Sequence, residues 1–179
     1  MPVHARRKPV TLVVPVNLRN YFPSKSARNF FSVINISYDF QSNSSNLETI
    51  IPFVSKEFQS ALSTEQITGR LNELGALEHN IFAQLVPLVF KDFALWAANK
   101  VSELGTTAAF SNIGKIDMPS ELIPYIRLFD AFTNTKRLQV CLCSFQDNLT
   151  ISFTSPLATP EVQRNFFRIL ANMGLDITI

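Results

Sequence analysis

The spacing of hydrophobic residues changes twice between residues 10 and 154, and the order of these changes strongly constrains the fold. Residues 10–16 form a β-branched run, VTLVVPV, and residues 30–40 alternate large apolar with polar side chains, as strands do. Residues 47–104 carry apolar side chains at helical spacing, and residues 106–154 return to strand patterns. Strands, a helical segment and further strands in this order predict a mixed sheet covered by helices.

The helical segment divides into three predicted helices. One of the polar residues 44–46 can cap the first helix, and the second is expected near residues 67–77. The third is expected over residues 80–104, where apolar side chains occur almost all round the helix. This pattern predicts a buried helix that Pro87 kinks or divides.

The C-terminal part predicts a second group of strands and one helix. Residues 106–113 are expected to form a strand that ends at Gly114, and residues 138–145 and 149–154 a hairpin. Residues 115–137 are expected to be an irregular or partly helical crossover. A helix should begin at Pro160 and end near Asn172, with a last strand over residues 175–179. The predicted fold class is α/β, a mixed-sheet α+β sandwich in a single domain over residues 1–179, with residues 1–9 as a flexible tail.

The composition of the chain indicates which partners and which cellular compartment to expect. Apart from the basic run at residues 6–8, the 16 basic and 14 acidic residues are interspersed, and they leave a net charge of +2, so no nucleic-acid partner is expected. No stretch approaches the ~20 apolar residues needed for a membrane span, and residues 1–9 lack a signal-peptide pattern. A cytoplasmic protein is therefore expected.

The two cysteines, Cys141 and Cys143, are expected to be buried free thiols. Their i, i+2 spacing puts them on one face of one strand, which suits neither a disulfide nor, without further His or Cys ligands, a zinc site. No metal site is predicted. The chain also lacks the glycine-rich phosphate-binding motifs and the G-x-S-x-G nucleophile motif.

The stretch VVPVNLRNYFPSKSARNFFSVINI, residues 13–36, resembles the start of the C-terminal half of condensation-domain and alcohol acetyltransferase-like proteins. In those families a strand ending in P-V-x-x-R leads through a loop to a second strand that begins near an N-F pair. The matching residues here are Pro15, Val16, Arg19, Asn29 and Phe30.

A second match lies in FSNIGKI, where Ser111, Asn112 and Gly114 resemble a turn that wax ester synthase-like acyltransferases place after their long helical segment. The strand hairpin, the Thr-Pro helix start and the amphipathic helix then follow in the same order. The resemblance covers residues 10–175 and is to the chloramphenicol acetyltransferase-like superfamily. It implies half of a CoA-dependent acyltransferase fold.

The resemblance also implies a reaction and a missing part. These enzymes move an acyl group from a CoA or carrier thioester to an alcohol or amine. Their general base is the second histidine of an H-H-x-x-x-D-G motif in the preceding half. The only histidines here, His4 and His79, lack that context, so no catalytic residue is assigned. The chain is expected to be inactive without an N-terminal half, with acyl-CoA or an acyl-carrier thioester as co-substrate and no permanently bound cofactor.

Five residues are candidates for substrate binding or active-site support: Arg19, Asn29, Ser111, Asn112 and Gly114. The resemblance implies that Arg19 pairs across the two halves with the motif aspartate, although it could instead be solvated or paired with a nearby carboxylate. Asn29 could simply satisfy backbone groups at a strand start. The other three residues could line an acyl or acceptor channel, or only form a strand-terminating turn.

A second hypothesis for the whole chain is that it is not an enzyme. The same half-fold could be a non-catalytic module for oligomerisation or ligand binding, because an isolated half exposes the face that its partner normally covers. The expected partner is either the N-terminal half or a second copy of the chain in a homodimer.

Overall fold

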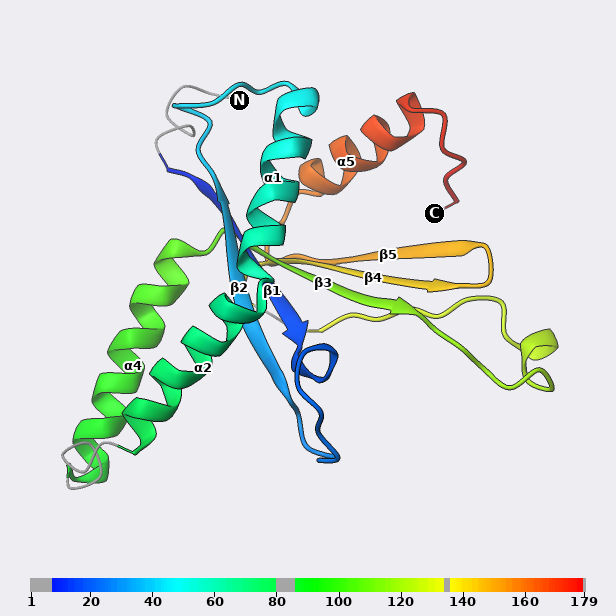
Figure 1. Cartoon of the computed structure of the whole chain (residues 1–179). Coiled ribbons are helices and arrows are strands. Elements are labelled where there is room, and N and C mark those ends of the chain that lie inside the picture. Colours follow the sequence, from blue (N-terminus) through cyan, green and yellow to red (C-terminus); the bar gives the residue numbers. More distant parts are fainter. Residues whose placement is uncertain (1–7, 80–85, 134–135, 179) are drawn as a thin grey trace. The chain divides into compact units, whose positions relative to one another are not determined.

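The computed structural model describes residues 8–79, 86–133 and 136–178, and the chain falls into two compact units, Met1–Thr107 and Ala108–Ile179 (Figure 1). Each unit is described by itself. Both combine helices with strands, and strands pair in both directions, so the α/β class with mixed strand pairing is confirmed. The single domain and the acyltransferase half-fold stay predictions. Residues 1–7 of the predicted tail lie outside the described residues.

The first unit is built on two long strands. β1 (Val10–Asn17) and β2 (Phe31–Tyr38) pair antiparallel from Val10↔Tyr38 to Asn17↔Phe31. Exposed and buried side chains alternate along β2, so one face of the strand is exposed to solvent and the other is buried. On the buried face, Ile34, Ile36 and Tyr38 are at most 5% exposed. Both predicted strands are confirmed. A short 3₁₀ turn, η2 (Leu18–Asn20), follows β1 and anchors its end through the buried Leu18.

Two helices follow the hairpin. α1 (Leu47–Ala61) begins where the Asn46 side chain accepts a hydrogen bond of 3.3 Å from the Glu48 backbone N–H, and α2 is Thr64–Glu78. The ring of Phe53 on α1 meets Tyr38 edge-on, with ring centroids 5.0 Å apart. This aromatic contact joins α1 to the buried face of β2.

The third helix, α4 (Leu88–Gly105), begins directly after Pro87, so the predicted helix does not run unbroken through this proline. Residues 80–85 of the predicted helix lie outside the described residues. The predicted burial is wrong, because none of the residues of α4 is buried: Phe93 is 66% exposed and Trp96 is 58% exposed. An all-round apolar surface predicts that something covers a helix, but it does not say that the cover belongs to the same chain.

The second unit holds three strands that pair in both directions. β3 (Ala108–Lys115) pairs parallel with β4 (Leu138–Phe145), and β4 pairs antiparallel with β5 (Asn148–Thr154). The crossover between β3 and β4 contains a 3₁₀ turn, η3 (Ile123–Tyr125). It covers one face of β4, where Cys141 and Cys143 are buried and free, as predicted.

The other face of this sheet carries the last helix, α5 (Glu161–Asn172). Phe153 of β5 meets Phe166 and Phe167 edge-on at centroid distances of 5.3 and 5.7 Å. The predicted hairpin and final helix are therefore confirmed. The predicted last strand is wrong for residues 175–178, which form no regular structure, and Ile179 lies outside the described residues.

Candidate functional site

Arg19 lies in η2, at the point where β1 ends, and its side chain is exposed. Its Nη2 donates hydrogen bonds to the backbone carbonyls of Ser26 at 2.8 Å and Arg28 at 2.7 Å. A third bond in the same region, from the Leu18 N–H to the Phe30 carbonyl at 3.1 Å, closes the base of the loop. The guanidinium therefore holds the loop between β1 and β2, and within the described residues Arg19 forms no ion pair.

Asn29 lies at the end of that loop, directly before β2, and is exposed. The carbonyl of the preceding residue, Arg28, is one of the two that Arg19 binds. The loop thus brings Arg19 and Asn29, ten residues apart in sequence, to one end of the β1–β2 hairpin. Among the described residues, the Asn29 side chain makes no hydrogen bond.

Ser111, Asn112 and Gly114 lie together on β3. The register with β4 shifts between Asn112 and Gly114, so Ile113 forms a bulge. The Asn112 Oδ1 accepts a hydrogen bond of 2.9 Å from the Gly114 N–H, and Gly114 has a φ of +86°, a conformation that favours glycine. The strand does not end at Gly114 as predicted, because β3 continues after the bulge to Lys115.

The five candidates fall into two groups. Arg19 and Asn29 belong to the first unit, whereas Ser111, Asn112 and Gly114 belong to the second. Of the two histidines, His4 lies outside the described residues, and His79 is exposed just after the end of α2.

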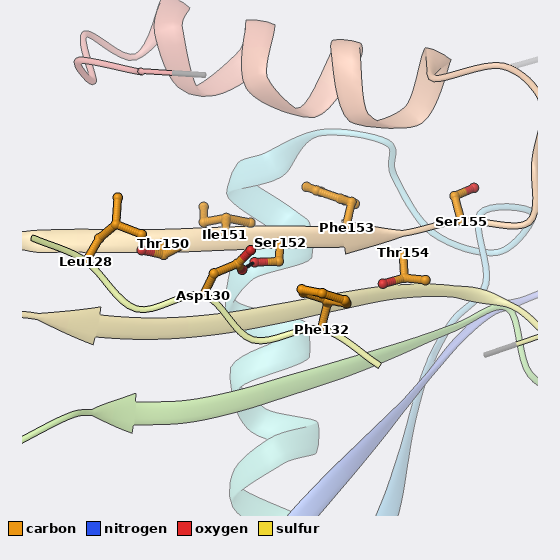
Figure 2. A pocket seen from close by; sticks show the side chains of 9 residues that line it. All are labelled: Leu128, Asp130, Phe132, Thr150, Ile151, Ser152, Phe153, Thr154 and Ser155. Carbon is orange, nitrogen blue, oxygen red and sulfur yellow. Dashed lines mark hydrogen bonds between the residues drawn. The ribbon is translucent and has the colours of Figure 1, made fainter. Parts of the chain in front are cut away.

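A groove that the sequence did not predict runs along β5 (Figure 2). Residues 150–155 line it together with Leu128, Asp130 and Phe132 of the crossover, and its volume is about 490 Å³. The Ser152 hydroxyl donates to the Asp130 carboxylate across the groove. The crossover has no regular hydrophobic period, so sequence reasoning could not place it beside β5.

The two cysteines lie beneath this crossover and are buried, and neither is in a disulfide. The Cys143 thiol donates to the Phe129 carbonyl at 3.2 Å, and the Gln139 side-chain amide donates to the Cys141 sulfur at 3.3 Å. Burial, and then the charge of Asp130 and the proximity of Cys141, raise the pKa of Cys143 above its ordinary value of 9.0, while a hydrogen bond with Thr150 opposes the rise. A protonated, buried thiol is a poor nucleophile, so this cluster is a core element.

The described part of the chain offers neither a cluster of metal ligands nor a membrane-spanning helix. No three histidine, cysteine, aspartate or glutamate side chains there are grouped closely enough to hold a metal ion. None of the helices in the same residues combines the length and apolarity needed to span a bilayer.

No protein-family model matches this chain, and neither a curated protein nor a solved structure matches it.

Proposed function

We propose that this chain is the C-terminal half of an acyltransferase of the chloramphenicol acetyltransferase-like superfamily. It acts only with an N-terminal half that carries the H-H-x-x-x-D-G motif. The reaction moves an acyl group from CoA or a carrier-bound thioester to an alcohol or amine in the cytoplasm. The thioester is a co-substrate, and no permanently bound cofactor is required.

The observation that carries this proposal is the hydrogen bonding and exposure of the Arg19 guanidinium. Its guanidinium is fixed in place by two carbonyls but remains exposed at the end of β1. Both bonds use Nη2, and in the described residues the Nε and Nη1 groups make no hydrogen bond. A fixed arginine with donors to spare is suited to bind a carboxylate supplied by another polypeptide, such as the motif aspartate.

The proposed division of labour follows from this pairing. A histidine of the N-terminal half removes the proton of the acceptor hydroxyl or amine, and the acceptor attacks the thioester carbonyl. The C–S bond then breaks, and the thiol leaves with a proton. Arg19 would act as a positioning residue, because its ion pair with the motif aspartate orients the loop that holds the histidine.

The bulge on β3 gives the second group of candidates a role in this scheme. Bulges are over-represented near active sites, where they redirect a strand and its side chains. Asn112 is exposed at the bulge, and its Oδ1 already holds the Gly114 N–H. The amide NH₂ of Asn112 makes no hydrogen bond in the described residues, so it could serve as a donor to the acyl or acceptor channel.

One observation favours the alternative, a non-catalytic module for oligomerisation or ligand binding. The apolar side chains of α4 are exposed, including Phe93 and Trp96, whose rings stack at a centroid distance of 5.9 Å. Such a surface suits a protein partner whether or not that partner brings a histidine.

Substitution of Arg19 tests the enzymatic proposal. Arg19→Gln should leave the free energy of unfolding of this chain within about 1 kcal/mol of wild type, because the side chain is exposed. In the two-part enzyme the same change should lower kcat/KM by about 100-fold or more, because it leaves the buried motif aspartate of the N-terminal half without its cationic partner. Rescue by Arg19→Lys should be weak, since lysine cannot form the bidentate pair.

Arg28→Gln is the matched control, because it removes a cation from the same loop but keeps the backbone carbonyl that Arg19 binds. The two-part enzyme should tolerate this change. Equal losses for Arg19→Gln and Arg28→Gln would contradict the pairing role, as would unfolding of the isolated Arg19→Gln chain.

A further inference from the structure

The outer edge of β5 is unprotected. β5 lies at the end of its sheet, and in the part of the chain that the structure describes it pairs with β4 alone. Natural proteins guard such edges with lysine, proline, inward charges or bulges, because the free N–H and C=O groups recruit other strands. β5, with the sequence NLTISFT, contains none of these residues, and its register with β4 is regular from end to end.

The hairpin turn determines which backbone groups face outward. Only Gln146 and Asp147 separate the paired residues Phe145 and Asn148, and Gln146 has the positive φ of +52° found in such turns. The residues that close a two-residue turn bond to each other, and bonded pairs then alternate along an antiparallel ladder. The N–H and C=O groups of the alternate residues Leu149, Ile151 and Phe153 therefore point to the open edge.

The side chains of β5 are arranged symmetrically about Ile151. Leu149 and Phe153 lie two residues on either side of it, and Thr150 and Ser152 lie one residue on either side. In an antiparallel pair of two copies centred on Ile151, each apolar residue would face an apolar residue, and each hydroxyl a hydroxyl. Cross-strand pairs of these kinds stabilise a sheet, and no like charges would meet.

We propose that a second copy of this chain adds its β5 to this edge, antiparallel, about a two-fold axis at Ile151. Ile151 is the middle one of the three residues whose N–H and C=O groups point to the open edge, and it is also the centre of the side-chain symmetry. Such a contact is isologous and closes as a dimer. The inference does not depend on the acyltransferase assignment.

The groove along β5 is suited to receive this strand (Figure 2). The crossover contributes two exposed apolar side chains to the lining of this groove, Leu128 at 51% exposure and Phe132 at 71%. Asp130 already accepts from the Ser152 hydroxyl, and in the proposed register Thr150 of the second copy lies opposite Ser152. The crossover would thus offer apolar contact to the incoming strand and a carboxylate acceptor to its Thr150 hydroxyl.

A charge swap at Ile151 tests the axis. Sedimentation should show a concentration-dependent dimer for the wild-type chain at tens of micromolar. Ile151→Lys and Ile151→Glu should each weaken self-association about tenfold or more, because identical charges meet at the axis. An equimolar mixture of the two variants should dimerise again, a rescue that damage to the fold of either variant could not produce.

Cysteine cross-linking tests the register. Directly opposed residues in a bonded antiparallel pair have Cα atoms about 5.5 Å apart, within disulfide range. Ile151→Cys should therefore form a covalent dimer under mild oxidation. Leu149→Cys should not, although Leu149 is 61% exposed, because it would face Phe153 of the second copy.

Several results would overturn the inference. They are a monomeric wild-type chain, no recovery in the charge-swap mixture, and equal cross-linking at residues 149 and 151. Protection of Ile151→Cys from alkylation only when an N-terminal half is added would assign the edge to that half instead. None of these measurements uses acyl transfer, so a result that overturns the dimer would not bear on the proposed acyltransferase function.

Discussion

Arg19 makes both of its hydrogen bonds to backbone carbonyls through a single nitrogen, Nη2. The sequence predicted either a carboxylate partner or solvent for this side chain, and the structure supplies a third solution. The loop between β1 and β2 points the carbonyls of Ser26 and Arg28 toward the guanidinium. Hydrogen bonds to side-chain hydroxyls within the loop accompany this conformation, such as the bond of 3.1 Å from the Arg28 N–H to the Ser26 Oγ. Such a loop conformation has no hydrophobic period from which to predict it.

Cys143 should make the stability of the chain depend on pH. Its raised pKa means that the folded protein keeps the thiol proton at a pH where the unfolded chain has lost it. The resulting stabilisation is full below pH 9 and decreases as the pH rises further, with a slope of up to about 1.4 kcal/mol per pH unit.

Urea unfolding at pH 8 and pH 10 measures this dependence. Cys143→Ala should show a smaller loss of unfolding free energy between the two pH values than wild type does. Cys141→Ala, which removes the neighbouring thiol on the same face, should keep most of the wild-type loss. Identical pH dependence in all three proteins would show that Cys143 is not the responsible group.

Gly114 should tolerate substitution poorly because of its backbone. Its φ of +86° is unfavourable for any residue with a Cβ, although nothing lies within 4 Å of the place that a Cβ would occupy. Gly114→Ala should therefore lower the free energy of unfolding by about 1–2 kcal/mol.

Gly69→Ala is the matched control for this substitution. Gly69 lies within α2, also with open space around a Cβ, and its φ lies outside the strained region. In a helix, alanine is favoured over glycine by about 0.5–1 kcal/mol, so this change should stabilise the chain. If urea unfolding shows the two variants to be equally stable, the bulge does not constrain Gly114.

The single tryptophan of the chain, Trp96, reports on α4. Since it is 58% exposed, the isolated chain should emit at long wavelength, and acrylamide should quench it nearly as well as it quenches the unfolded protein. Docking of an N-terminal half onto α4 should shift the emission to shorter wavelength. Blue-shifted, protected emission from the isolated chain would instead support the burial that the sequence predicted.

Elements with a strong period were predictable, and those whose structure depends on distant partners were not. β4 spans residues 138–145, as the alternation of Gln139, Cys141, Cys143 and Phe145 predicted, because that alternation is local. The bulge at Ile113 and the groove along β5 depend on strand pairing and on an irregular crossover. Neither leaves a local pattern in the sequence, so the structure was needed to find them.

The two units share a property that bears on the function of the whole chain. Each leaves a surface that suits a partner: α4 in the first unit is apolar and exposed, and β5 in the second has an unguarded edge. The candidate residues Arg19 and Asn112 are also exposed, and in the described part of the chain each has side-chain N–H groups that donate no hydrogen bond. An enzyme half whose catalytic base lies on another polypeptide would have these properties, and so would a module built for assembly.

The presence of a catalytic base separates these two accounts most directly. The measurement is thiol release from acetyl-CoA with a panel of alcohols and amines, by this chain alone and with an added N-terminal half that carries the H-H-x-x-x-D-G motif. The enzymatic account predicts no turnover by the chain alone and turnover by the mixture, with the positioned base contributing about 10²–10⁴-fold. Turnover by the chain alone that His79→Ala abolishes would contradict the account, and so would an inactive mixture in which the two halves demonstrably bind.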